Sequence, residues 1–234
     1  MSLMNLKEII VQFTPMDNVK ILLDVCTAEI EVKKSRFICT LIPVNSDEDA
    51  SKHIAAVKKK YYDARHNCQA FVVGDNNEYS RSSDDGEPQG TAGKPMLEVL
   101  SGSGIHNVLA VVTRYFGGVL LGTGGLIRAY QGAVKEALEV ANSCGHVATK
   151  GRGFITEISS DYSDSGKIIY LLNSLNLPVT DTVYGENVTV KTVVSLGDKD
   201  SFYKKIADLT SARAKITEVC ESEYLISDNG IKFI

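Results

Sequence analysis

The stretch N107-V-L-A-V-V-T-R-Y-F-G-G-V-L-L-G-T-G-G-L-I-R-A-Y130 joins the most apolar segment of the chain to a glycine-rich turn. Residues 107–116 are predicted to form a buried strand, since almost all of them are apolar or β-branched. After the turn, apolar side chains recur every three or four positions between residues 125 and 142, which predicts an amphipathic helix. The expected buried stripe of this helix consists of Leu126, Ala129, Ala133, Ala137 and Val140.

The residues before this stretch predict strands with two helices among them. The expected elements are strands at 21–32 and 36–44, a helix at 46–62, a strand at 66–74 and a short helix around 95–100. The strands are rich in β-branched residues, and the long helix has acidic residues in its first turn and lysines in its last. Ser46 is the expected N-cap of the long helix, and Pro95 is expected at the first position of the short one.

The pattern restarts after residue 150 and gives six further elements. They are a strand at 154–160, a helix at 164–176, strands within 177–185 and 187–197, a helix at 200–209 and a strand at 215–226. This β-α-β-β-α-β order is the split arrangement of ferredoxin-like folds, and Asp164 is the expected cap of its first helix. We therefore expect an α+β chain with two domains, at residues 1–150 and 151–234.

The composition is that of a globular protein, with 44% apolar and 23% charged residues. Five scattered cysteines without a C-x-x-C pair indicate reduced thiols in the cytoplasm and argue against structural zinc. No apolar run is long enough to predict a membrane span, and the N-terminal residues lack the pattern of a secretory signal. The net charge of −4 gives no general attraction for nucleic acid, so any anion site has to be local.

The loop S83-D-D-G-E-P-Q-G-T-A-G-K-P95 has the composition of a phosphate-binding loop but not its pattern. Pro88 stands where the first glycine of a P-loop is needed, and Pro95 stands where its hydroxyl residue is needed. Two interpretations remain. The N–H groups near Gly90 and Gly93 could form an anion-binding nest with Lys94 beside a helix N-terminus, or the loop is a turn that leads into a helix.

Three acidic residues in the same loop are candidate ligands for magnesium or calcium. Asp84, Asp85 and Glu87 carry the oxygen ligands that these ions prefer. Their spacing does not match the calcium loop of an EF-hand, and adjacent carboxylates in a Gly/Pro loop are typical of a solvated surface. No resident metal or other cofactor is therefore expected.

The glycine turn at 117–125 lies between a buried strand and a long helix, where ligands often bind. The dinucleotide-binding pattern G-x-G-x-x-G is not met, because Ile127 occupies its third glycine position. Arg114 and Arg128 could still bracket an anion, and Tyr115, Phe116 and Tyr130 offer faces for stacking. The alternative is that Tyr115 or Phe116 lies in the core and both arginines form ion pairs.

His66 and Cys68 are the remaining pair of potentially reactive residues. They lie two positions apart on a predicted strand, so they share one face of the sheet. A nucleophile needs its base within hydrogen-bond reach, and this spacing serves that poorly. A structural histidine beside a buried thiol is the favoured interpretation, and no known catalytic signature occurs elsewhere.

Four stretches together resemble the signature of the YigZ/IMPACT family. They are K33-K-S-R-F-I38, H66-N-C-Q-A-F71, R81-S-S-D-D-G-E-P-Q-G-T-A-G-K-P-M-L97 and V112-T-R-Y-F-G-G-V-L-L-G-T-G-G-L-I-R-A-Y130. The resemblance is dense over residues 24–142 and extends along the chain, because bacterial members carry a second small ferredoxin-like domain. Gln89 and Thr123 differ from the small residues expected there, and the residues before about position 20 have no clear counterpart.

The resemblance implies a fold for each domain. The first would be similar to the β-α-β fold of a small-subunit ribosomal protein and of domain IV of elongation factor G. The second would be similar to the ferredoxin-like domain that follows in that factor. The resemblance also implies a link to translation, because eukaryotic relatives are translational regulators; they bind an activator of a stress-responsive kinase through an additional domain that is not expected in this chain.

These expectations lead to one main hypothesis, a non-enzymatic, translation-related regulator that contacts RNA or the ribosome. The residues expected to contact phosphate or to shape the surface are Arg81, Lys94, Arg114, Arg128, Gly117, Gly118, Gly124 and Tyr115. The alternative is an enzyme or small-ligand binder that takes an anionic, phosphorylated ligand in a cleft between the two glycine-rich loops. A third interpretation makes residues 113–128 a docking face for a protein partner in translation control.

Overall fold

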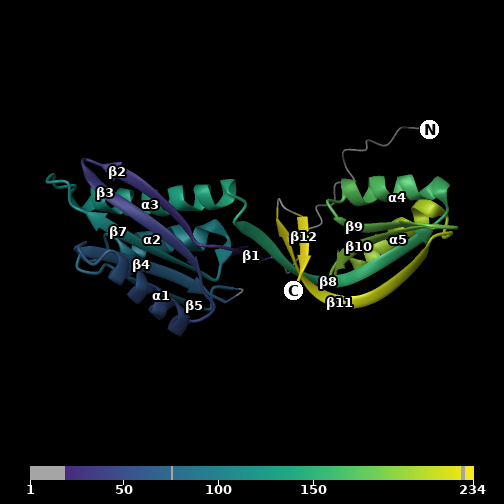
Figure 1. The fold of residues 1–234 in the computed structure, drawn as a ribbon, viewed down its shortest axis with the longest axis horizontal. Helices are drawn as coiled ribbons and strands as arrows, with labels where there is room; N and C mark the ends of the chain where they lie inside the picture. Colours follow the sequence, from purple (N-terminus) through teal and green to yellow (C-terminus); the bar gives the residue numbers. More distant parts are fainter. Residues whose placement is uncertain (1–18, 75, 228–229) are drawn as a thin grey trace. The chain divides into compact units, whose positions relative to one another are not determined.

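The structure, a computed structural model, describes residues 19–74, 76–227 and 230–234 (Figure 1). They form two compact units: an N-terminal unit of residues 19–149 with Ser227, and a C-terminal unit of residues 150–226 and 230–234. The expectations for the first 18 residues fall outside the described residues. Among the described helices, none is both long and apolar enough to span a membrane.

The N-terminal unit is built on a five-stranded antiparallel sheet with the strand order β2-β3-β7-β4-β5. The bounds are β2 Cys26–Val32, β3 Ser35–Pro43, β4 His66–Val73, β5 Tyr79–Ser83 and β7 Val108–Tyr115. The most apolar strand of the sequence, β7, is the central one, and all of its residues except Tyr115 are buried. A short parallel pair, β1 (Val19–Leu22) and β6 (Ile105–His106), belongs to the same unit but is not part of this sheet.

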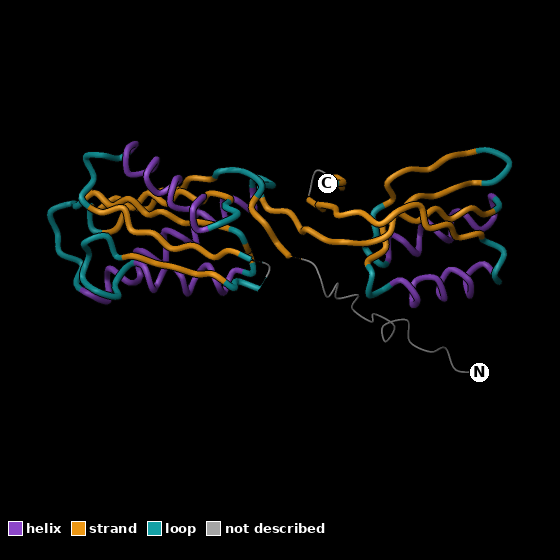
Figure 2. The backbone as a smooth tube through the Cα atoms, turned by 90° about the horizontal axis from the view of Figure 1, so that it is seen from below, coloured by secondary structure: helices purple, strands orange, loops and turns teal. Residues whose placement is uncertain are grey.

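Helices cover both faces of this sheet (Figure 2). Helices α2 (Gly93–Ser103) and α3 (Thr123–Ser143) pack on the face that carries Val108, Ala110 and Val112. Helix α1 (Asp47–Lys60) packs on the opposite face, against Leu109 and Val111. Alternate side chains of a strand point to opposite faces, so β7 contributes to both cores.

The C-terminal unit has the expected β-α-β-β-α-β order. Its elements are β8 Val147–Ser160, α4 Tyr162–Ser174, β9 Val179–Tyr184, β10 Val188–Ser195, α5 Lys199–Thr210 and β11 Lys215–Ser227, followed by β12 Gly230–Phe233. The sheet order β11-β8-β10-β9 is that of a ferredoxin-like fold, and β12 lies beside β11. Ile158, Val190, Ile168 and Phe202 belong to one core, so both helices pack on the same face of the sheet.

Several local predictions were wrong. The strand expected at 21–32 is two strands, β1 and β2, with a break after Leu22. Pro95 is the third residue of α2 and not the first. Its missing N–H costs no helical hydrogen bond there, because the first such bond runs from the Met96 N–H to the Ala92 carbonyl oxygen. The cap of α4 is Asp161, whose side chain accepts a bond from the backbone N–H of Asp164.

The predicted buried stripe of α3 is correct except at its end. Val140 is partly buried, while Leu126, Ala129, Ala133 and Ala137 are buried. The helix also buries side chains that the stripe did not include: Tyr130, Val134, Leu138 and Ala141. A helix that lies flat on a sheet and also contacts a second helix buries more than one narrow stripe.

Candidate functional site

One end of the N-terminal unit gathers most of the residues that the sequence singled out. Phe37, Arg114 and His66 form one row across β3, β7 and β4. The β2–β3 turn, the end of α1, the loop 84–92 and the loop 116–122 all meet the sheet at or beyond this row. We call this part of the unit the loop end.

The carboxylate of Asp84 fills the turn that had been a candidate anion nest. Its Oδ1 accepts from the N–H of Gly93 at 2.8 Å and of Ala92 at 3.0 Å, and its Oδ2 accepts from Gly90 at 2.8 Å. Burial alone would raise the pKa of Asp84, but these three backbone donors lower it below its ordinary value. The loop therefore does bind an anion at the start of α2, and that anion is its own side chain.

Asp85 ties the same loop to the sheet and to α1. Its carboxylate accepts from the Lys58 ammonium at 2.6 Å and from the Asn67 N–H at 2.8 Å. The ring of His66 contacts the Asp85 carbonyl oxygen, with its Nδ1 at 2.9 Å. Because α1 and β4 both hold this residue, the loop lies fixed against the start of β4.

Glu87 is buried and joins the two glycine-rich segments. Its Oε1 lies 2.6 Å from a guanidinium nitrogen of Arg114 and accepts from the Tyr130 hydroxyl at 2.8 Å. The side chains of Arg114 and Glu87 are only 8% and 3% exposed. The guanidinium also lies over the rings of Phe37 and Phe116, with centroid distances of 5.4 and 5.6 Å. Glu87 thus links the first loop to the strand before the second loop and to the helix after it.

The acidic residues of this loop consequently serve donors of the chain itself. Within the described residues, no group of three or more His, Cys, Asp or Glu side chains is placed to hold a metal ion. The Cys68 thiol lies 2.9 Å from the Asp84 carbonyl oxygen and 3.3 Å from the Tyr130 hydroxyl, two acceptors for its single proton, and burial raises its pKa to about 12. His66 and Cys68 thus contact the carbonyl groups of the loop rather than each other.

The second loop begins with a close backbone contact. A Cβ on Gly117 would overlap the backbone of Lys34 and Ser35, and the Gly117 N–H donates to the Ser35 hydroxyl at 3.2 Å. Gly118 follows with a φ of +83°, a conformation that favours glycine. The glycine pair therefore lets the chain pass against the β2–β3 turn.

Helix α3 begins at the loop end without a side-chain cap. Its N-cap is Gly122, and no side chain bonds to its first N–H groups. Such a terminus carries a partial positive charge and free donors. Gly124 and Arg128 lie exposed in its first turns. The first turn of α2 is capped by the Asp84 carboxylate, whereas that of α3 has no side-chain cap.

The structure sorts the predicted site residues into three groups. Lys94, Arg128, Gly117, Gly118, Gly124 and Tyr115 lie at the loop end. The hydroxyl of Tyr115 donates to Asp63 at 2.8 Å, so its ring is fixed beside the end of α1. Arg114 lies beneath the surface with Glu87, and Arg81 pairs with Asp47 at 2.9 Å, away from this end.

Sequence reasoning did not include Lys33 and Lys34 among the site residues. Both are exposed, form the β2–β3 turn, and have φ values of +49° and +66°. Such hairpin turns strongly favour Asn and Gly, so two lysines there are unusual and are the signal that could have found them. The turn also lies in the quoted stretch K33–I38.

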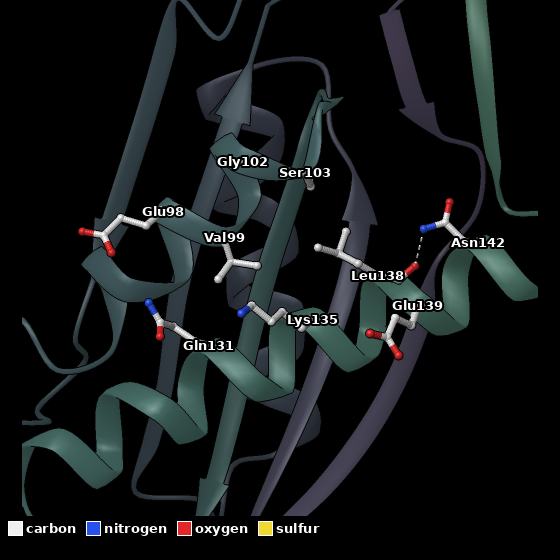
Figure 3. A pocket seen from close by; sticks show the side chains of 9 residues that line it. All are labelled: Glu98, Val99, Gly102, Ser103, Gln131, Lys135, Leu138, Glu139 and Asn142. Carbon is white, nitrogen blue, oxygen red and sulfur yellow. Dashed lines mark hydrogen bonds between the residues drawn. The ribbon is translucent and has the colours of Figure 1, made fainter.

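A groove lies elsewhere in the same unit, between α2 and α3 (Figure 3). It has a volume of about 510 Å³. It is lined by Glu98, Val99, Gly102, Ser103, Gln131, Lys135, Leu138, Glu139 and Asn142. These residues come from the later parts of both helices, whereas the loop end lies at their N-termini.

Comparisons with known proteins give matches over both units. Residues 33–138 match the Impact N-terminal domain, and residues 158–213 match a domain of unknown function, DUF1949. The chain is 43% identical over 190 residues to the IMPACT family member YvyE of Bacillus subtilis, which covers 81% of this chain and 86% of that protein. It is 37% identical over 195 residues to YigZ of Escherichia coli, covering 82% and 93%.

A solved structure agrees with the fold over most of the chain. The crystal structure of a protein described as hypothetical is 34% identical, with a TM-score of 0.53, and the match covers 88% of this chain and 98% of that one.

Proposed function

The chain belongs to the IMPACT family, and on this basis we propose that it is a non-enzymatic, translation-related regulator of the cytoplasm. It acts by binding RNA or the ribosome through the loop end of its N-terminal unit. Family membership supports the translation-related part, because the eukaryotic relatives that the sequence motifs resemble are translational regulators.

The observation that carries the binding proposal is a set of exposed cations at the loop end, where helix α3 begins without a side-chain cap. Lys33, Lys34, Lys94 and Arg128 are exposed at the loop end. The nearby carboxylates of Asp84, Asp85 and Glu87 are each held by donors of the chain. Asp85 is offset by Lys58 and Glu87 by Arg114, so the exposed cations of the loop end are the charges that we expect to attract phosphate, although the whole chain carries −4.

This arrangement suits phosphate rather than a particular base sequence. Lysines in a turn and an arginine beside a helix N-terminus provide charged and N–H donors to phosphate oxygens. Contacts of this kind give affinity that depends on salt and not on sequence. Arg114 has a different role in the proposal, because its pairing with Glu87 fixes the strand from which the second loop departs.

The test compares two triple variants with the same change of charge. Lys33→Ala with Lys34→Ala and Arg128→Ala removes cations of the loop end. Lys20→Ala with Lys52→Ala and Lys135→Ala removes three exposed lysines elsewhere in the unit. With fluorescently labelled RNA at low salt, the first variant should bind about 10-fold more weakly and the second nearly as the parent. Absence of RNA affinity, or equal loss in both variants, would contradict the proposal.

A further inference from the structure

The loop 116–122 carries apolar side chains in an exposed position. Phe116 is 58% exposed, Val119 41% and Leu120 83%. The adjacent Leu121 is partly buried and packs against the core of the unit. Two neighbouring leucines of one loop therefore differ completely in environment, and the one at 120 has no packing role.

The exposed part of the loop is held at both of its ends. Gly117 lies against the backbone of the β2–β3 turn and donates to Ser35. At the other end, Leu121 lies close to Gly125 in the first turn of α3. The chain between these anchors thus presents Leu120, and part of Val119, to solvent.

Cations and a further aromatic ring belong to the same end of the unit. Lys34 lies against Gly117, and Arg128 lies in the helix that follows the loop. Tyr62 is 85% exposed and stands next to Asp63, which accepts the bond from Tyr115.

Apolar groups bordered by cations match a ligand that has flat apolar faces and negative charges at short spacing. Unpaired RNA has both, whereas the bases of a duplex are stacked inside and only its phosphates and groove edges are accessible.

We propose that the loop 116–120 receives an unpaired base of RNA, so that the loop end binds single-stranded or bulged RNA in preference to duplex. The base packs on Phe116 and Leu120, while its neighbouring phosphates meet Lys33, Lys34 and Arg128. This inference rests on the proposed function and narrows it to one class of RNA. Apolar side chains that contact or separate bases are a known device of nucleic-acid-binding proteins.

The experiment measures the affinity of the full chain for two probes, an unstructured oligouridine strand and an RNA duplex of the same length. Phe116→Ala with Leu120→Ala should weaken binding of the single strand by about 10-fold and leave the duplex affinity unchanged. Leu120→Ala alone is the second variant, because Phe116 also contacts Arg114 whereas Leu120 lies free in solvent. Leu23→Ala removes a leucine that is 41% exposed at the other end of the unit, and should change neither affinity.

A spectroscopic readout separates base contact from a general effect on the fold. A strand that carries 2-aminopurine should change its fluorescence on binding the parent, and less so on binding Leu120→Ala. Equal losses for strand and duplex, or no loss for either, would overturn the inference. If the lysine and arginine triple variant still weakens both probes in that case, the proposed function stands alone. If neither probe binds the parent, both the inference and the proposed function fail. If Leu120→Ala impairs only the binding of ribosomal proteins that carry no RNA, the loop docks on protein instead.

Discussion

At the residue scale, Asp84 decides what the first glycine-rich loop can do. Three backbone N–H groups that could have held a phosphate instead hold its carboxylate. The same bonds lower its pKa below the ordinary value, despite the opposing effect of burial. A carboxyl group whose pKa is lower in the folded state stabilises the fold above its unfolded pKa, and this contribution is lost as the pH falls through the folded value.

Asp84→Asn should therefore lower the free energy of unfolding by about 2 kcal/mol near neutral pH, since it replaces charged hydrogen bonds at a helix start. The difference between variant and parent should shrink at acidic pH, once the pH falls through the lowered pKa of Asp84 and the parent carboxylate becomes protonated. Urea unfolding at both pH values measures this. A difference that stays the same at the two pH values would show that the charge of Asp84 is not what holds the loop.

Glu87 and Arg114 form a buried ion pair, and removing one partner leaves the other charged and without a partner. Glu87→Ala should cost about 3–5 kcal/mol of unfolding free energy. The exposed pair of Glu29 with Arg36 is the control, because its side chains are 44% and 51% exposed, and Glu29→Ala should cost less than about 1 kcal/mol. A double-mutant cycle of Glu87→Ala with Arg114→Ala should show strong coupling. Similar costs for the two ion pairs would refute the assigned role.

At the element scale, the β2–β3 turn and the loop 116–122 form one surface because Gly117 lets their backbones touch. Gly117→Ala should force them apart, lower stability by about 2 kcal/mol and weaken RNA binding. Gly102→Ala in α2 meets no neighbouring atom and should raise stability by about 0.5–1 kcal/mol. Thermal unfolding together with RNA titration checks both. Unchanged RNA affinity in Gly117→Ala would mean that the turn and the loop act separately.

The elements that the sequence predicted are those with a strong pattern. The apolar run of β7, the helical spacing of α3 and the β-α-β-β-α-β order after residue 150 each follow from local periodicity. Strand β5 was missed because Tyr79–Ser83 is a polar edge strand, and edge strands need not alternate. The cap at Asp161 was misassigned because two aspartates three positions apart both suit the role.

The candidate site was only partly predictable, for a different physical reason. The sequence identified both glycine-rich loops and the residues Lys94 and Arg128. It could not show that Asp84 turns back onto Gly90 and Gly93, or that Lys34 lies beside Gly117. Contacts of that kind depend on how the sheet places segments that are distant in the chain. For Lys33 and Lys34, the signal was present in two lysines at hairpin-turn positions, but their backbone conformation was needed to recognise it.

At the scale of the whole molecule, a net charge of −4 opposes the approach of RNA, so binding depends on the local field of the loop end. Salt dependence tests this most directly, because each phosphate contact releases counterions. A plot of log affinity against log salt concentration should have a slope of about −3 for a single strand held by the four cations. The loop-end triple variant should have a slope near −1, while the matched control triple keeps the parent slope. A slope near zero in the parent, or identical slopes in both variants, would contradict RNA binding at this site.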